Sequence, residues 1–148
     1  MFKKIILGVF IGLIVGGILI QFLPYGHEHT NPPVTAEPQW NNQQTRDLVT
    51  RACYDCHSNQ TTWPWYSNIA PLSWLIQHDV EEGRSRLNFT EWNQSRRETE
   101  DAARQVQRGA MPQWYYVLLH PTANLTSDEK QALIQGLQAS LSGRGQTQ

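Results

Sequence analysis

Concentrated positive charge is absent from this sequence. It contains no basic stripe and no run rich in lysine and arginine, and its formal net charge is −1. Nucleic acid is therefore not an expected partner, because binding to phosphates calls for a basic surface. Sustained alternation of apolar and polar residues, which marks a half-buried strand, is also missing. Its absence predicts an all-α protein.

Cysteine is scarce, and the two that are present, Cys53 and Cys56, are separated by only two residues. A disulfide between them would close a very short loop and remove little entropy from the unfolded chain. A structural zinc site needs four ligands, and no further cysteine exists to complete one. A redox dithiol expects a strand before its first cysteine, whereas a helical pattern leads into Cys53. Zinc and a structural disulfide are disfavoured, and a dithiol stays open as an alternative.

Charged side chains are missing from residues 5–20, IILGVFIGLIVGGILI, and the apolar character continues to Leu23. This length matches about one bilayer of helix. Lys3 and Lys4 precede it, so the positive-inside rule places the N-terminus in the cytoplasm. We expect residues 1–23 to form a single-pass anchor in the inner (cytoplasmic) membrane, with the rest in the periplasm or another extracytoplasmic space. A cleaved signal peptide is the alternative, although no small-x-small cleavage pattern follows the apolar run.

The segment after the apolar run is polar and rich in proline. Residues 24–39, PYGHEHTNPPVTAEPQ, have no hydrophobic period, which is typical of an extended spacer. We expect one folded domain over residues 40–142, followed by a flexible tail over residues 143–148.

Apolar residues at helical spacing predict four helices in the domain. These cover residues 43–53, 71–83, 94–108 and 126–141. The second is expected to begin at Pro71 and to stop at Gly83, and the third to end at Gly109. The last begins with a capping box, Thr126 to Glu129. Such short helices bury little apolar surface, so a buried cofactor would make up the deficit.

One interpretation of the cysteines also accounts for the residue that follows them. In the pattern Cys-x-x-Cys-His the two thiols can add to the vinyl groups of a haem, and the histidine then lies under the iron as its axial ligand. Cys53 and Cys56 are accordingly predicted to be thioether anchors, and His57 the proximal iron ligand.

Several segments, in the same order, resemble the c-type cytochromes, and more closely a small group described as a haem-binding domain with a single Cys-x-x-Cys-His. They are CYDCHSNQTTWPWYSNIAP, GRSRLNFTEW, RGAMP and LTSDEKQALIQGL. The resemblance implies a small cytochrome c-like helical domain around one covalently bound haem c, whose iron transfers electrons. It also implies export, because bacteria attach haem c on the outer side of the cytoplasmic membrane. The insert Trp63-Pro64-Trp65-Tyr66 departs from ordinary cytochromes c.

The second axial ligand is expected to be Met111, the only methionine beyond the apolar run. It lies between two predicted helices, where a thioether can reach iron and Pro112 stiffens the loop. The alternative ligand is His78, and the alternative role for Met111 is to fill a gap in the core.

Further residues are expected around the haem. Trp63, Trp65 and Trp74 are predicted to pack against the porphyrin, which would exclude water from it. Arg84, and similarly Arg86, suits the carboxylates of the haem propionates, although a solvated helix face explains these arginines equally well.

Together these expectations describe a membrane-tethered electron carrier and not an enzyme. Its partners would be the membrane, through the N-terminal helix, and a redox protein whose identity the sequence leaves open. A peroxidase-like accessory module would need an open iron position and a distal acid-base group, which a methionine ligand disfavours. A gas sensor with a displaceable methionine is the other alternative.

Overall fold

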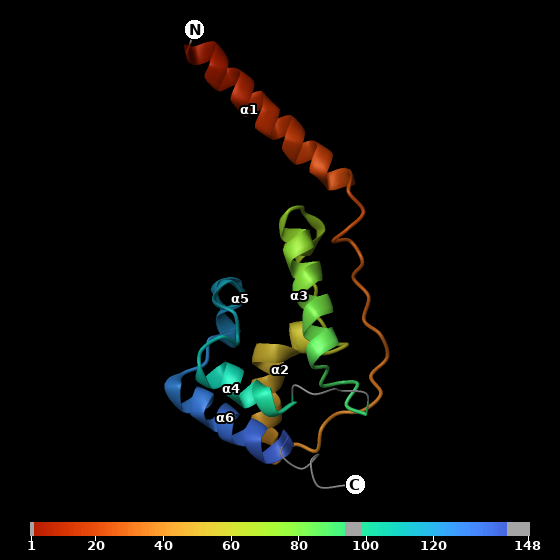
Figure 1. Ribbon diagram of the computed structural model, residues 1–148, viewed down its shortest axis with the longest axis vertical. Coiled ribbons are helices and arrows are strands. Elements are labelled where there is room, and N and C mark those ends of the chain that lie inside the picture. Colours follow the sequence, from red (N-terminus) through yellow and green to blue (C-terminus); the bar gives the residue numbers. More distant parts are fainter. Residues whose placement is uncertain (1, 94–98, 142–148) are drawn as a thin grey trace. The chain divides into compact units, whose positions relative to one another are not determined.

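The computed structural model describes residues 2–93 and 99–141. Within these ranges every regular element is a helix, and the only extended pairing is an isolated bridge between Ala36 and Glu91 (Figure 1). The predicted all-α class is confirmed. The chain divides into two compact units: unit 1 comprises Met1–Thr30 with Trp63–Asp79, and unit 2 comprises Asn31–Thr62 with Val80–Gln148.

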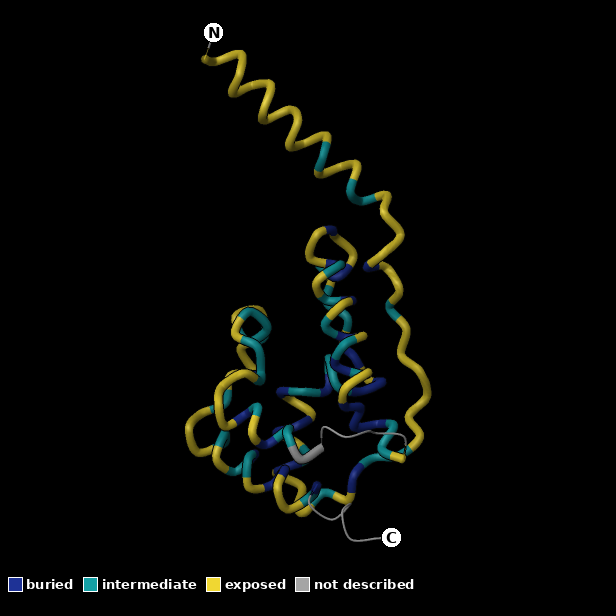
Figure 2. Tube along the Cα trace, in the orientation of Figure 1, coloured by how far each residue is buried: buried dark blue, intermediate teal, exposed yellow. Residues whose placement is uncertain are grey.

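Unit 1 contains the apolar helix α1, Phe2–Leu19, which continues as the 3-10 turn η1, Ile20–Phe22. It also contains η2, Trp65–Asn68, and the first half of α3, Leu72–Arg86. None of the described residues of α1 is buried (Figure 2). With a mean hydropathy of 2.6 over Phe2–Phe22, this helix is long and apolar enough to cross a membrane.

Unit 2 is built mainly from three helices: α2, Gln43–His57; α4, Thr99–Gln107; and α6, Ser127–Leu141. Helix α6 packs against both α4 and α2 (Figure 1). Their apolar faces form a core whose most buried large side chains include Phe89, Leu133 and Val49. The shorter helices α5, Trp114–Leu119, and η3, Pro121–Ala123, lie between α4 and α6 in the sequence.

Local side-chain hydrogen bonds set the starts of two of these helices. The Asn42 side chain accepts a hydrogen bond from the Thr45 amide at 2.8 Å and so caps α2. The capping box predicted before α6 is present. The Thr126 amide donates to Glu129 Oε2 at 2.9 Å, and the Glu129 amide donates to Thr126 Oγ1 at 3.2 Å.

The helix boundaries differ from the prediction in several places. Helix α2 does not end at Cys53 but continues through the cysteines to His57. Helix α3 begins at Leu72 and passes Gly83 to end at Arg86, so the prediction that Gly83 stops it is wrong. Helix α5 was not predicted, because six residues are too few to show a helical period. The predicted start of the third helix at Gln94 lies outside the described residues.

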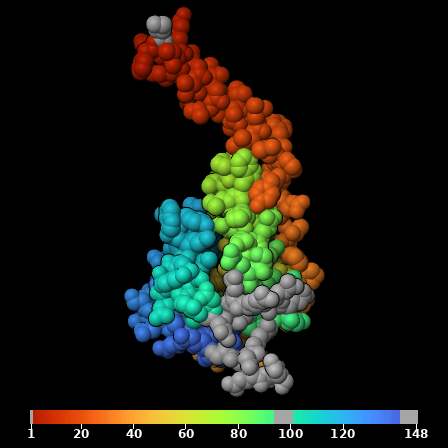
Figure 3. All heavy atoms as spheres, in the orientation of Figure 1, coloured from red at the N-terminus to blue at the C-terminus, as the bar shows by residue number. Residues whose placement is uncertain are grey.

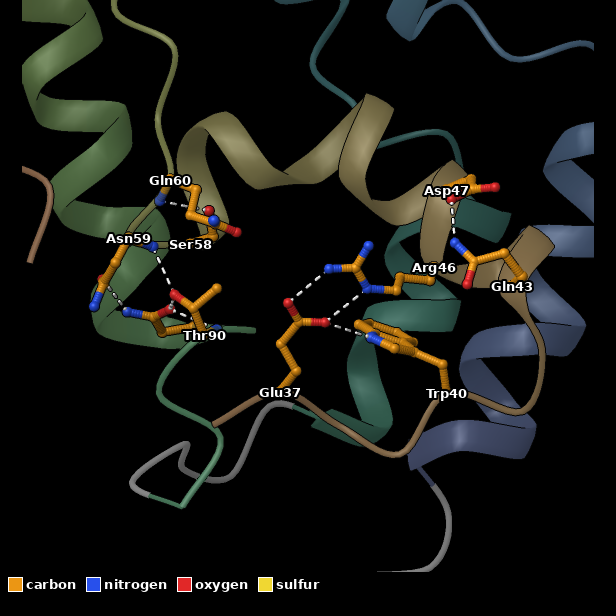
Figure 4. Close-up of polar contacts among 10 residues, drawn as sticks. Glu37, Trp40, Gln43, Arg46, Asp47, Ser58, Asn59, Gln60 and Thr90 are labelled. Atoms are coloured by element: carbon orange, nitrogen blue, oxygen red, sulfur yellow. Dashed lines mark hydrogen bonds and ion pairs between the residues drawn. The ribbon is translucent and has the colours of Figure 1, made fainter. Parts of the chain in front are cut away.

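The spacer expected over residues 24–39 is divided between the units. Its second half, residues 31–39, belongs to unit 2 and is hydrogen-bonded to other segments of that unit. The Thr35 and Ala36 amides donate to the Thr90 carbonyl at 2.9 and 3.2 Å. Glu37 accepts hydrogen bonds from Arg46 of α2 at 2.8 and 2.9 Å and from the Trp40 indole at 3.1 Å (Figure 4). This part of the chain is therefore ordered on the domain and is not a free linker.

Candidate functional site

The last turn of α2 brings together the three residues of the Cys-x-x-Cys-His motif. Residues three and four apart share one face of a helix, so Cys53 is followed on its own face by Cys56 and His57. The two cysteines are not joined by a disulfide, and both are half-buried. Because the two cysteines lie on the same face of the helix, both thiols can bond to one large group.

The environment of Cys53 differs from that of a redox cysteine. Reactive thiols have lowered pKa values and commonly lie at the N-terminal end of a helix, where the helix dipole favours the thiolate. Cys53 lies near the C-terminal end of α2, and burial raises the pKa of its thiol to about 12. The thiol is therefore protonated at neutral pH, which argues against the redox dithiol.

The His57 ring is held by two backbone carbonyls. Its Nδ1 lies 3.1 Å from the Gly83 oxygen and 3.0 Å from the Leu87 oxygen. Carbonyl oxygens only accept hydrogen bonds, so Nδ1 carries the proton and, in the neutral ring, Nε2 carries the lone pair. This tautomer and this kind of partner are typical of a histidine that binds metal through Nε2.

Gly83 allows this hydrogen bonding through a close approach of two helices. A side chain at this position would place its Cβ 2.4 Å from the Cys56 carbonyl oxygen. Only glycine lets the second half of α3 lie directly against the end of α2, which brings the Gly83 carbonyl to the histidine. The glycine thus serves packing and not helix termination.

A cavity of about 250 Å³ opens beside the motif. Most of its surface is apolar and comes from α2, α4 and α6, from the end of α3 and from the loop after α4. The lining includes Cys53, His57 and Met111, together with Leu87, Phe89, Val106 and Leu137. The predicted proximal ligand, one predicted anchor and the predicted second ligand therefore meet at one apolar space, although the sequence separates them widely.

Met111 is brought to this cavity by the end of α4. Gly109 adopts a positive φ of 75°, which reverses the chain after the helix. The amides of Ala110 and Met111 then both donate to the Gln105 carbonyl, at 3.0 and 3.2 Å. Met111 also lines a second cavity of about 150 Å³, which it shares with Val117, Lys130 and others. Met111 therefore lies at the border of both cavities.

Comparison with known families agrees with this geometry. A family model described as a haem-binding domain matches residues 15–139, most of the chain. The chain belongs to the haem-binding domain family. No curated protein and no solved structure matches it. Haem is thus the cofactor, and the residues at the cavity fit it: an apolar space, a histidine in the metal-binding tautomer and a soft thioether sulfur.

Among the described residues, Arg86 and Arg108 line the cavity, and the predicted Arg84 does not. Arg84 donates to the Ser58 carbonyl at 2.8 Å and to Asn31 and Thr61 at 2.9 Å each, so its guanidinium ties together segments of unit 2. The lining contains Arg86 instead, which also pairs with Glu82, and Arg108, which donates to Gln105.

The three tryptophans predicted to pack on the haem, Trp63, Trp65 and Trp74, all belong to unit 1. The cavity is lined by residues of unit 2, and its aromatic member is Phe89. The Phe89 ring lies edge-on to His57, with centroids 6.4 Å apart. His78, the alternative ligand, is exposed on α3 and is not part of the lining.

Sequence reasoning missed the contacts that orient the motif. No signal in the sequence could have identified the Gly83 and Leu87 carbonyls, because every residue has a backbone carbonyl.

Asp55, between the two cysteines, was also not singled out. It accepts hydrogen bonds from the Tyr116 hydroxyl at 2.7 Å and from the Thr62 amide at 2.9 Å. Burial, and then the hydrogen bond to Asp55, raise the pKa of Tyr116, so the phenol stays protonated and ties α5 to the motif.

Proposed function

We propose that this haem-binding domain is a membrane-tethered mono-haem c-type cytochrome that transfers electrons on the extracytoplasmic side. The observation that carries the proposal is the tautomer of His57, set by two carbonyls at a cavity that Cys53 and Met111 also line. When bound, the haem iron supplies the chemistry by alternating between its ferric and ferrous states.

The roles of the residues follow from their positions. His57 would hold the iron through Nε2, while the Gly83 and Leu87 carbonyls keep its ring orientation constant. Cys53 and Cys56 would form the thioether bonds, and Met111 would supply the second ligand to the iron. The apolar lining excludes water, and Arg86 and Arg108 supply positive charge for the propionates in place of the predicted Arg84. With both residues bound to the iron, an electron could be exchanged without a substrate pocket.

Covalent attachment is the first test. The protein is produced with a haem-attachment system, denatured, and separated by electrophoresis with staining for haem. The haem is expected to stay on the polypeptide and to show the reduced pyridine spectrum of haem c. Cys53→Ser and Cys56→Ser should each leave at most one thioether bond. Haem that extracts freely from the unsubstituted protein would contradict the proposal.

The tether is supported by the exposed apolar helix α1 and by Lys3 and Lys4 before it. An alkaline phosphatase fused after the C-terminus is expected to be active, since that enzyme needs an oxidising, extracytoplasmic space. The intact chain, including residues 1–23, is expected in washed membranes. Membrane-derived protein without those residues would favour a cleaved signal peptide.

A second candidate function is gas binding through displacement of Met111. It is favoured by the 150 Å³ cavity on which Met111 also borders, because this space can receive the side chain when it leaves the iron. Carbon monoxide added to the reduced, unsubstituted protein at neutral pH separates the two candidates. An unchanged spectrum supports the electron carrier, and rapid binding supports the sensor.

A further inference from the structure

The end of the apolar helix is tied to a loop distant in sequence. Gln21, in η1, donates from Nε2 to the Ala70 carbonyl at 3.0 Å, and the Ala70 amide donates back to Gln21 Oε1 at 2.9 Å. The same Nε2 also donates to the Gly17 carbonyl of α1 at 2.9 Å. This two-way pairing within unit 1 places residue 70 beside the end of the helix.

Two further contacts continue the attachment along the chain after α1. Gly26 has a φ of 90°, and a Cβ there would lie 2.8 Å from Ser73 and Trp74 atoms, so its backbone lies directly on the start of α3. The His29 ring stacks on Trp63 at 4.5 Å, and its Nε2 is 3.0 Å from the Ser67 carbonyl oxygen. Figure 3 shows the segment after α1, in orange, against the yellow-green start of α3.

The segment held in this way combines aromatic and aliphatic side chains with neutral polar ones. No aspartate, glutamate, lysine or arginine occurs between Asp55 and Asp79. Four of its large apolar side chains are nevertheless exposed: Trp65 at 76%, Ile69 at 45%, Leu72 at 44% and Leu75 at 42%. Leu72 and Leu75 are three residues apart in α3 and therefore neighbours on its surface. We call these four side chains the collar.

We propose that the collar rests in the headgroup region of the same bilayer that α1 spans. The inference rests on the membrane anchor of the proposed function and adds a second contact with the membrane. Gln21 lies near the C-terminal end of the apolar span Phe2–Phe22, and its pairing with Ala70 holds the collar at that level. Tryptophan is enriched at membrane interfaces because its ring is apolar and its indole N–H is polar. Neighbouring leucine and isoleucine side chains add apolar area without a charge to desolvate.

The collar also accounts for the Trp63-Pro64-Trp65-Tyr66 insert. Trp63 faces the segment after α1, through its stack with His29, whereas Trp65 is exposed. The insert therefore connects the segment that follows α1 with the exposed collar, which we place at the membrane surface. In this assignment Trp65 contacts lipid and not the porphyrin.

Spin labels on the full-length, haem-loaded protein in phosphatidylcholine–phosphatidylglycerol vesicles test the collar. Single cysteines are introduced for a nitroxide label by Ile69→Cys in the collar, Ile14→Cys in α1 and Gln131→Cys on the exposed side of α6. Power saturation compares collisions with oxygen, which dissolves in lipid, and with a nickel chelate, which stays in water. The unsubstituted protein carried through the labelling gives the background from Cys53 and Cys56.

The label at position 69 is expected to have an oxygen-to-nickel ratio several-fold above that at position 131 and below that at position 14. If the ratio at position 69 equals that at position 131 while position 14 is in lipid, the proposed contact of the collar with the bilayer is wrong and the membrane anchor is retained. The collar would then be a surface available to a protein partner. If position 14 is also in water, the anchor fails and the collar fails with it.

The tie through Gln21 is tested in the same labelled protein. Gln21→Ala removes both hydrogen bonds to Ala70 and is expected to lower the ratio at position 69 towards that at position 131, while position 14 stays in lipid. Gln39→Ala, at an exposed residue of unit 2, is the matched control and should change neither ratio. A ratio unaffected by Gln21→Ala would overturn the role assigned to this glutamine.

Discussion

At the scale of single residues, the two proposed ligands of the iron are held in different ways. Nδ1 of His57 lies within hydrogen-bond distance of the Gly83 and Leu87 carbonyls, so the proposed binding of iron through Nε2 would depend on the backbone at the end of α3. Met111 is hydrogen-bonded through its backbone amide, to the Gln105 carbonyl of α4, and it packs against the apolar core where two cavities meet it, without a polar contact of the kind that fixes the His57 ring. The two ligands should therefore differ in how readily they are displaced.

Met111→Ala is predicted to keep the haem covalently attached while emptying the second axial position. The sulfur-to-iron charge-transfer band near the red end of the oxidised spectrum should disappear, and carbon monoxide should bind after reduction. The potential should fall by tens to hundreds of millivolts, since axial ligands set haem potentials over about 0.8 V. Optical titration measures both effects, and His78→Ala is the control that should change neither. The opposite pattern would assign the ligand to His78.

At the scale of secondary-structure elements, the crossing of α2 and α3 positions the motif. Gly83→Ala is predicted to destabilise the fold by about 1–3 kcal/mol, the usual cost of overpacking, because its methyl group would lie 2.4 Å from the Cys56 carbonyl oxygen. A glycine-to-alanine change at an exposed helix position would instead stabilise the fold by up to about 1 kcal/mol. The sign of the change in the free energy of unfolding therefore distinguishes a packed glycine from an exposed one. Urea unfolding measures it, with Ser85→Ala on the same helix as control. Equal or higher stability of Gly83→Ala would contradict the close crossing.

The attachment of Glu37 to α2 is predicted to depend on pH. Arg46 holds the pKa of Glu37 below its usual range, so the pair stabilises the fold above the unfolded value of about 4.3 and loses this effect as pH falls through the folded pKa. Glu37→Gln should lower the free energy of unfolding by roughly 0.5–1 kcal/mol at pH 7 and by less at pH 3.5. Urea unfolding at both pH values measures this, and Glu28→Gln, exposed in the first half of the spacer, is the control. A loss that is equal at both pH values would rule out the ion pair as its cause.

At the scale of the whole molecule, the division into units predicts where the chain can be shortened. A chain beginning at Thr30, exported by a foreign signal, should be soluble and keep its haem spectrum, because unit 2 begins at Asn31. A chain beginning at Trp40 should also bind haem but melt at a lower temperature, because it lacks the Glu37 pair and the bonds of Thr35 and Ala36 to Thr90. Equal melting temperatures would show that residues 30–39 add nothing to the fold.

The features that the sequence alone determined are those carried by local pattern. Helical spacing predicted the α class, the capping box predicted the start of α6, and adjacent residues identified Cys53, Cys56 and His57 as one motif. The tertiary structure alone decided which distant groups meet that motif. It replaced Arg84 with Arg86 and Arg108 at the cavity, assigned Gly83 to a helix crossing, and put Trp65 in the unit that contains α1. The physical reason is that a motif depends on covalent spacing, whereas the lining of a cavity depends on which helix faces pack together, and backbone carbonyls carry no signal in the sequence.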